Sequence, residues 1–259
     1  MNVEIKMLKT LQPKESILIG GLPGIAYIGK LSVDHLIQQL KAELVAEVYS
    51  KFFPPYVMIR NDGIVELMKN ELYYLKNETG KDIFFLTGNA QAFSPEGQYE
   101  IADKLLDWAI NLGVKRVFSI AALLTDRQFE TPNVYGTTTT PVLLEEIKKY
   151  GVLPLDQGSI SGTNGLIIGL AKKKNIDGIC LLGETRGYQT PEGLYVLDPR
   201  AVRAVLNVLT ALLNLKPDMT LLDKQTKEMD DLIRKIAEIE RNMREEMREA
   251  TTKKPSYVT

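Results

Sequence analysis

Short apolar runs alternate with segments of helical spacing along most of the chain. Runs with the length of buried strands lie at residues 16–20, 45–48, 56–59, 64–68, 72–75, 83–87, 117–121 and 179–182. Apolar residues recur every three or four positions, or follow a helix-starting proline, at residues 24–40, 99–112, 141–150 and 201–213. Strands and helices in this order predict an α/β domain with a twisted mixed sheet flanked by helices.

Several of the predicted strands lie close together between residues 43 and 75. They are punctuated by Pro54, Pro55 and an Asn61-Asp62-Gly63 turn, which is typical of hairpin connections. We therefore expect a group of adjacent, hairpin-connected strands in this part of the domain.

The composition changes after Pro217. Residues 223–249 hold seven Lys or Arg and nine Asp or Glu, with no Gly or Pro. A single narrow apolar seam runs through this segment at three- and four-residue spacing, at Met229, Leu232, Ile236, Ile239 and Met243. Such a seam is typical of a helix that packs on a partner helix or on a protein surface. We expect an α/β body at 1–217, a long amphipathic helix at 218–250 and a mobile tail at 251–259.

The charge and the apolar content exclude several classes of function. A formal net charge of −1 gives no basic field for nucleic acid. The first ten residues alternate apolar and charged side chains, unlike a signal peptide. No apolar stretch approaches the ~20 residues that span a bilayer. The expected location is the cytoplasm, without membrane or nucleic-acid partners.

One edge of the predicted sheet gathers polar residues. Glycines bracket a Ser-Gly-Thr-Asn turn near residue 160, and the strand at 179–182 leads into Glu184, Thr185 and Arg186. Ligands often bind at the carboxyl ends of strands in open α/β sheets. The candidate ligand edge consists of Gly24, Thr163, Asn164, Glu184 and Arg186. Glu184 and Arg186 can serve as an acid and an anion clamp, or they can form a structural ion pair.

The sequence offers few candidate catalytic residues. Gly24, Gly29 and Lys30 have the spacing of a phosphate-binding P-loop, but Leu31 stands where that loop needs Ser or Thr for Mg²⁺. A tight strand-to-helix turn with closely packed glycines is the favoured interpretation. The sole histidine, His35, lies within a predicted helix with no nucleophile near it in sequence. We expect no catalytic residue, no metal site and no cofactor.

Five blocks of sequence carry a family resemblance. They are GGLPGIAYIGKLSVDHLI, FPPYVMIRNDGIVEL, FLTGNAQAFSPEGQYEIADKLLDWAINLGVKRVFSIAAL, GSISGTNGLIIGLAKKKNIDGICLLGETRGY and DPRAVRAVLNVLTALLNL. In this order they resemble the archaeal members of the proteasome assembly chaperone family, of the second-chaperone type. The resemblance covers about residues 15–235. It implies a fold similar to nucleoside phosphorylases, used without their chemistry, in a protein that handles proteasome subunits or the core particle.

The resemblance also directs attention to the carboxyl terminus. Members of this type often carry an exposed tail that ends in a hydrophobic residue, Tyr and any residue, and that docks between proteasome α subunits. This chain ends in Ser256, Tyr257, Val258 and Thr259, so its tyrosine is third from the end instead of second. Docking of Tyr257 is a hypothesis, and a terminal segment without a role is the alternative.

Two main functions remain open on the sequence. The first is a cytoplasmic, non-enzymatic chaperone or adaptor that forms a ring-shaped homo-oligomer through its carboxyl-terminal helix and co-assembles with a related protein. The second is a small-molecule enzyme or binding protein that holds a nucleoside or phosphorylated compound at the sheet edge. A structural subunit of another complex is a third.

Overall fold

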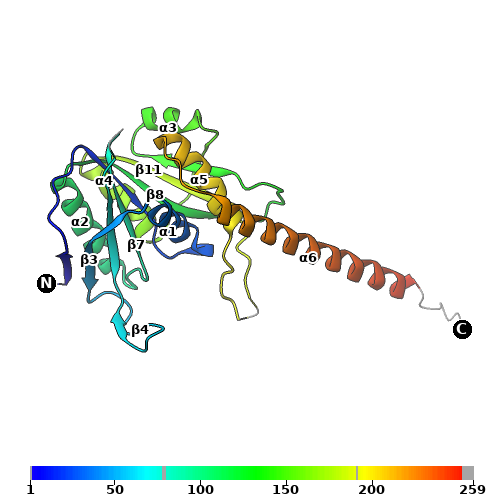
Figure 1. Ribbon diagram of the computed structural model, residues 1–259. Coiled ribbons are helices and arrows are strands. Elements are labelled where there is room, and N and C mark those ends of the chain that lie inside the picture. The colour runs from blue at the N-terminus through cyan, green and yellow to red at the C-terminus, as the bar shows by residue number, and fades with distance from the viewer. Residues whose placement is uncertain (1, 78–79, 191, 253–259) are drawn as a thin grey trace, which may run out of the picture. The chain divides into compact units, whose positions relative to one another are not determined.

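The computed structural model describes residues 2–77, 80–190 and 192–252 (Figure 1). The chain forms two compact units, Met1–Asp218 and Met219–Thr259. The first unit is built on a nine-stranded sheet with the strand order β1-β3-β6-β7-β2-β8-β11-β9-β10. These strands are β1 (Val3–Met7), β2 (Ser16–Gly20), β3 (Glu43–Ser50), β6 (Asn70–Leu75), β7 (Asp82–Gly88), β8 (Val114–Leu124), β9 (Val134–Thr138), β10 (Leu153–Pro154) and β11 (Asp177–Thr185).

The sheet is mixed, as the sequence predicts. Its centre is four parallel strands, β7, β2, β8 and β11, while β6 and β9 run antiparallel to their neighbours β7 and β11. The central strands are almost wholly buried, because helices cover both faces and no solvent-facing side remains. Their carboxyl ends therefore meet at one edge of the sheet.

Helices pack on both faces of the sheet. They are the 3₁₀ turn η1 (Ile25–Tyr27), α1 (Ile28–Leu40), α2 (Pro95–Asn111), α3 (Pro141–Lys148), α4 (Gly162–Lys173) and α5 (Pro199–Leu213). Helix α1 packs on α5 and on the central strands, α2 packs on α4, and α3 packs on β9 and β10. Two helices begin with ordinary amino-terminal caps. Ser94 accepts a hydrogen bond from the Gly97 amide at 3.1 Å at the start of α2, and Asp198 caps α5.

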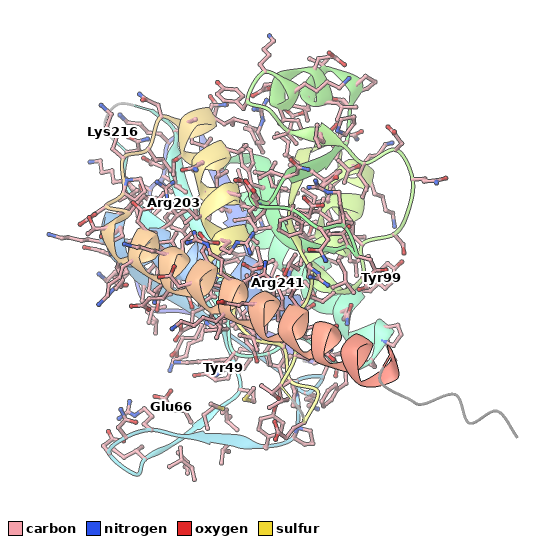
Figure 2. All side chains as sticks on the ribbon, turned by 90° about the vertical axis from the view of Figure 1, so that its right-hand side faces the viewer. Tyr49, Glu66, Tyr99, Arg203, Lys216 and Arg241 are labelled. Atoms are coloured by element: carbon pink, nitrogen blue, oxygen red, sulfur yellow. The ribbon has the colours of Figure 1, made fainter. Side chains whose placement is uncertain are left out.

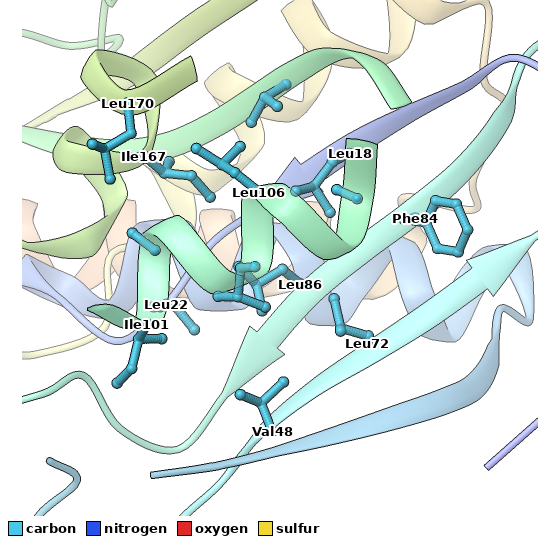
Figure 3. Packing of buried hydrophobic residues seen from close by; sticks show 14 of the residues in the cluster. Leu18, Leu22, Val48, Leu72, Phe84, Leu86, Ile101, Leu106, Ile167 and Leu170 are labelled. Carbon is cyan, nitrogen blue, oxygen red and sulfur yellow. The ribbon is translucent and has the colours of Figure 1, made fainter. Parts of the chain in front are cut away.

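The larger core lies between the sheet and the α2–α4 layer (Figure 3). Leu18, Phe84 and Leu86 contribute from the strands, and Ile101 and Leu106 contribute from α2. Ile17 and Ile19 are buried as well but do not belong to this cluster. Alternation along β2 directs them to the opposite face, where α1 and α5 lie. This two-sided burial confirms the predicted class of a mixed sheet flanked by helices.

The strands between residues 43 and 75 divide into two sheets. Strands β3 and β6 pair with each other in the main sheet, whereas β4 (Val57–Ile59) and β5 (Val65–Leu67) form a separate two-stranded sheet. We call residues 56–67 the ribbon. In Figure 1 the ribbon projects from the lower end of the first unit. The sequence predicts the strands and their turn, but it does not predict that this pair leaves the main sheet.

Strand β1 and the pair β9 and β10 are elements that the apolar runs do not predict. Strand β1 alternates apolar and charged residues and pairs with β3 at the sheet edge, so only one of its faces is buried. Residues 137–138, in the run of threonines, belong to β9, which pairs with β11. An edge position explains why neither segment shows a continuous apolar run.

The second unit contains one helix, α6 (Thr220–Thr252), of 33 residues. At 1.5 Å per residue such a helix is about 50 Å long. It confirms the long carboxyl-terminal helix of the predicted fold. In the described part of the chain, no helix combines the length and the apolarity that a membrane crossing requires.

Candidate functional site

A cavity of about 580 Å³ opens at the carboxyl edge of the central strands, where the sequence predicts a ligand edge. It lies between the loop after β2, the end of β8 and the loop that leads into α4. Its lining consists of Gly24, Ile25, Gly29, Gln91, Gln98, Ala121–Leu124, Leu155, Gln157–Gly162, Asn164 and Leu182. None of these lining residues is charged. A volume of this size suits a small ligand, but the lining offers no acid, base or ion pair.

The amide side chains at this cavity are bound within the protein. Asn164 accepts from the Leu22 amide and donates to the Leu22 carbonyl, each at 3.0 Å. Ser119 donates its hydroxyl to the Asn164 carbonyl at 2.5 Å. The two bonds to Leu22 join the loop after β2 to α4 across 142 residues of sequence, and the bond from Ser119 joins β8 to the same helix. Asn164 therefore has a structural role, since both the oxygen and the nitrogen of its side-chain amide already have a partner within the protein.

The start of α4 is capped by Gln91. Its Oε1 accepts from the Thr163 amide at 2.7 Å, and its Nε2 donates to the Pro23 carbonyl at 2.5 Å. Gly162 precedes this contact with φ of 78°, a conformation that favours glycine, and Thr163 is buried. Helix amino termini attract anions, but here a neutral side chain occupies that position. This arrangement argues against a phosphate site at α4.

Glu184 pairs with Arg127, and its position excludes the expected pairing with Arg186. The Glu184 side chain is 1% exposed and accepts both Nε and Nη2 of Arg127, at 2.9 and 2.5 Å, as well as the Asn133 amide at 3.0 Å. Burial opposes the charge of Glu184, yet these hydrogen bonds outweigh it and lower the pKa of the carboxyl. The pair fixes the loop at residues 125–133 on the end of β11.

Arg186 lies apart from that pair. Its guanidinium stands 5.9 Å from the ring centroid of Tyr188. Neither Glu184 nor Arg186 lines the cavity, so the structure separates the predicted ligand edge into two groups. Gly24 and Asn164 line the cavity, with Thr163 buried beside it, while Glu184 supports a loop. Arg127 and Gln91 are the partners that sequence reasoning missed. Neither stands near its partner in the chain, so spacing alone carries no signal for them.

The P-loop spacing is explained by close packing. A Cβ on Gly29 would lie 2.4 Å from the Ile120 carbonyl oxygen, so α1 approaches β8 more closely than any side chain allows. Lys30 pairs with Asp34 one helical turn later, at 2.8 Å. The lysine therefore neutralises a neighbour on its own helix, and the glycine allows the helix to pack on the sheet.

The remaining reactive groups are also engaged or buried. The His35 Nε2 lies 3.0 Å from the Asp218 carbonyl oxygen. Burial raises the pKa of the Cys180 thiol to about 12, which keeps it in the unreactive protonated form. Among the described residues, no three His, Cys, Asp or Glu side chains gather as metal ligands would.

Helix α6 carries the predicted seam. Met229, Leu232, Ile236, Ile239 and Met243 all belong to this helix and share one face by their spacing. The side chain of Leu232 is 48% exposed. The side chains of Ile236, Ile239 and Met243, and the whole of Tyr257, lie outside the described residues.

The ribbon is an exposed apolar surface that the sequence analysis did not single out. Seven of its apolar residues are more than two-fifths exposed, among them Ile59 at 73%. Figure 2 shows the ribbon standing away from the rest of the first unit, with Glu66 on it and Tyr49 on the neighbouring strand β3. A signal was present, since VMI and IVEL lack the alternation of apolar and polar residues that a solvent-exposed hairpin usually has.

Three comparisons relate this architecture to known proteins. A model of the PAC2 family matches residues 18–237. The uncharacterized protein MJ1210 of Methanocaldococcus jannaschii is 36% identical over 252 residues, which cover 96% of this chain and 93% of that protein. The solved structure of Pyrococcus furiosus PbaB, an archaeal proteasome activator, is 35% identical with a TM-score of 0.82, and the match covers 91% of this chain and 99% of that chain.

A further solved structure supports the fold. Pyrococcus furiosus PbaA, an archaeal homolog of proteasome-assembly chaperone, has a TM-score of 0.74 at 24% identity over 96% of this chain and 98% of that chain. The family match spans the first unit from β2 onward and half of α6. It confirms the resemblance seen in the sequence blocks. The chain belongs to the PAC2 family.

Proposed function

We propose that this protein is a non-enzymatic binding partner of the proteasome, an assembly chaperone or adaptor that acts in the cytoplasm through protein contacts and self-association. The observation that carries the proposal is its 35% identity, over 91% of the chain, to a protein described as an archaeal proteasome activator. The partner is either free proteasome subunits or the assembled core particle.

The candidate ligand edge supports this proposal because its residues are uncharged or already have interaction partners within the protein. Its cavity lining is uncharged, and the amides of Gln91 and Asn164 are each held by two backbone partners. Glu184, a buried carboxylate near this edge, is paired with Arg127, and its pKa is lowered. The Glu184 carboxylate already accepts three hydrogen bonds within the protein, which favours a structural role over that of a general acid or base.

Self-association through α6 follows from its seam. An apolar side chain that stays exposed to water lacks the roughly 1.5–3 kcal/mol of stabilisation that full burial would give it. Contact between seams of neighbouring copies covers them, and a head-to-tail arrangement closes into a ring. Changing Ile236 and Ile239 to Asp should lower the mass in light scattering. Changing Arg234 and Glu238, polar positions on the same helix, to Ala should leave the mass unchanged.

Docking of the carboxyl-terminal tail is the second contact that we propose. Tyr257 lies near the terminal carboxylate, although one position further from it than the family pattern requires. Deletion of residues 255–259 should weaken binding to proteasome core particles, as should Tyr257→Ala, while Val258→Ala should not. Unchanged binding after the deletion would remove the tail from the proposal but leave binding through the rest of the chain.

The decisive experiment is a binding assay with purified proteasome core particles and free α subunits. The full chain should co-migrate with one of them in native gels and sediment with it at micromolar concentration. Co-assembly with a related protein predicts an added band when that protein is supplied. Absence of binding to either species, in a chain that is folded and oligomeric, would refute the proposed function.

The cavity of about 580 Å³ favours a second candidate, a protein that binds a nucleoside or phosphorylated compound. Specific binding raises thermal stability with ligand concentration, so a thermal-shift screen with nucleosides and nucleotides tests it. A saturable shift that is lost on Asn164→Ala, a substitution in the cavity lining, would support this candidate against the first.

A further inference from the structure

The ribbon has one face made wholly of aliphatic side chains. In its register Val57 lies opposite Leu67, and Ile59 lies opposite Val65. Side chains at alternate positions share a face, so these four point to the same side. All four are exposed, with Ile59 at 73%. A β-ribbon of two strands is marginally stable alone, and an aliphatic face in water adds nothing to it.

The opposite face and the turn carry the charges of the ribbon, one arginine and two carboxylates, with a net charge of −1. Arg60 contacts Asp62 at 2.6 Å and Glu66 at 2.9 Å, so two carboxylates share one guanidinium near the turn. This cluster stabilises the turn, and its net charge is only one unit. The ribbon is therefore poorly suited to bind a strongly charged partner surface.

A hollow of about 500 Å³ lies at the base of the ribbon. Val57 and Leu67 of the aliphatic face belong to its lining, so the two features form one continuous surface. Tyr49, Phe53 and Pro55 line the rest of it together with Asn2, Glu4, Ser50, Lys51, Pro54, Tyr56 and Met68. The surface thus consists of a projecting apolar ribbon directly beside an apolar recess.

We propose that a second copy of this chain covers this surface, with the ribbon of each copy seated in the hollow of the other. A two-fold contact uses the same patch on both copies, and a projection beside a recess is self-complementary in that arrangement. Seven ribbon residues that each bury roughly 60–120 Å² would cover about 400–800 Å², which approaches the ~800 Å² per partner of a standard interface.

The ribbon needs a partner that covers it at all times, and a second copy of the chain meets this need better than a different protein does. An apolar ribbon whose outer strand edges are unpaired in the described structure is a site for aggregation whenever it is exposed. A partner that binds only at one stage of a process would leave it exposed for the rest. Another copy of the chain is present at matching concentration from synthesis onward.

This inference concerns the self-association of the proposed function, at a surface other than α6, and is independent of proteasome binding. Its test is light scattering on the full chain that carries Asp at positions 236 and 239, which removes the α6 seam. This variant should be a dimer of twice the 29.1 kDa chain mass. Adding Ile59→Asp and Val65→Asp should halve the mass to one chain, with the circular dichroism spectrum unchanged.

The matched control is Val142→Asp. Val142 lies on α3 and is 77% exposed, so this substitution removes a similar apolar side chain from a different surface. In the same background it should remain a dimer. A monomeric α6 variant, or a dimer that survives the double ribbon substitution, would overturn the inference. Either result leaves the proposed function standing, since proteasome binding and α6 association are measured separately.

Discussion

The carboxyl edge of the main sheet and the ribbon each border a hollow of similar size, about 580 and 500 Å³, yet they differ in what remains unpartnered. At the edge, the side chains of Gln91, Asn164 and Glu184 already have hydrogen-bond partners inside the protein. On the ribbon, the side chains of Val57, Ile59, Val65 and Leu67 stand in water. Free energy for binding is available where groups are unsatisfied, so the ribbon is the better candidate for contact with a partner.

The largest effect should come from filling the close approach at the edge. Gly29→Val would place a side chain against the Ile120 carbonyl, whose backbone has no room to shift. We expect a loss of about 3 kcal/mol or more in the free energy of unfolding, measured in urea. Gly169→Ala is the control, because a Cβ there meets nothing within 4 Å. That variant should be equal to the natural chain or slightly more stable.

Glu184→Gln should cost about 2 kcal/mol, because it removes a charge-assisted pair whose acidic partner is buried while Arg127 is half exposed. The effect should depend on pH. The pKa of Glu184 is lowered from 4.5 in the folded chain, so its stabilisation is complete above pH 4.5 and is lost as the pH falls through the folded value.

Thermal melts from pH 7 to pH 3 measure this dependence. The natural chain should lose more stability over the acid range than Glu184→Gln, and the two should converge at the lowest pH. Parallel curves for the two proteins would show that Glu184 is not ionised and paired in the folded state. Arg127→Met gives an independent check, since it leaves Glu184 without its cation.

Gln91→Ala should cost about 1 kcal/mol, since the Thr163 amide and the Pro23 carbonyl each lose a neutral partner. Gln157→Ala removes the same type of side chain from an exposed position in the cavity lining and should change stability by less than about 0.5 kcal/mol. Equal effects of the two variants in urea unfolding would contradict a structural role for Gln91.

The smallest effect on folding should come from the ribbon. Ile59→Ser alters a side chain that is 73% exposed within one chain, so the monomer's unfolding free energy should change by less than about 0.5 kcal/mol. The measurement is urea unfolding in a background that light scattering shows to be monomeric. A cost of several kcal/mol would mean that Ile59 packs within its own chain, and the contrast between the two regions would fail.

Much of the fold could be predicted from residues that lie close in sequence. The run at 16–20 and the run at 83–87 are buried strands because helices cover both faces, and such strands are continuously apolar. Strand β1 escaped prediction because an edge strand needs no such run. The departure of β4 and β5 from the main sheet depends on pairing of β3 with β6 across the intervening residues, which no local pattern encodes.

The candidate ligand edge shows the limit more sharply. Glu184 and Arg186 are two residues apart, a spacing that puts side chains on one face of a strand, so the sequence suggests a pair. Strand β11 ends at Thr185, however, and the Arg186 guanidinium lies by the Tyr188 ring. The carboxylate instead meets Arg127, 57 residues away. Similarly, Asn164 owes its burial to a loop 142 residues earlier in the chain. Partners at such separations are brought together only by the sheet topology.

The sequence by itself determined the α/β class, the long carboxyl-terminal helix and the membership of the PAC2 family, because these depend on periodicity and on the order of blocks along the chain. Only the tertiary structure decided which polar groups are already satisfied and which apolar groups are left uncovered. Hydrogen-bond saturation and exposure are properties of neighbours in space, and those neighbours are assigned when the strands take their order in the sheet.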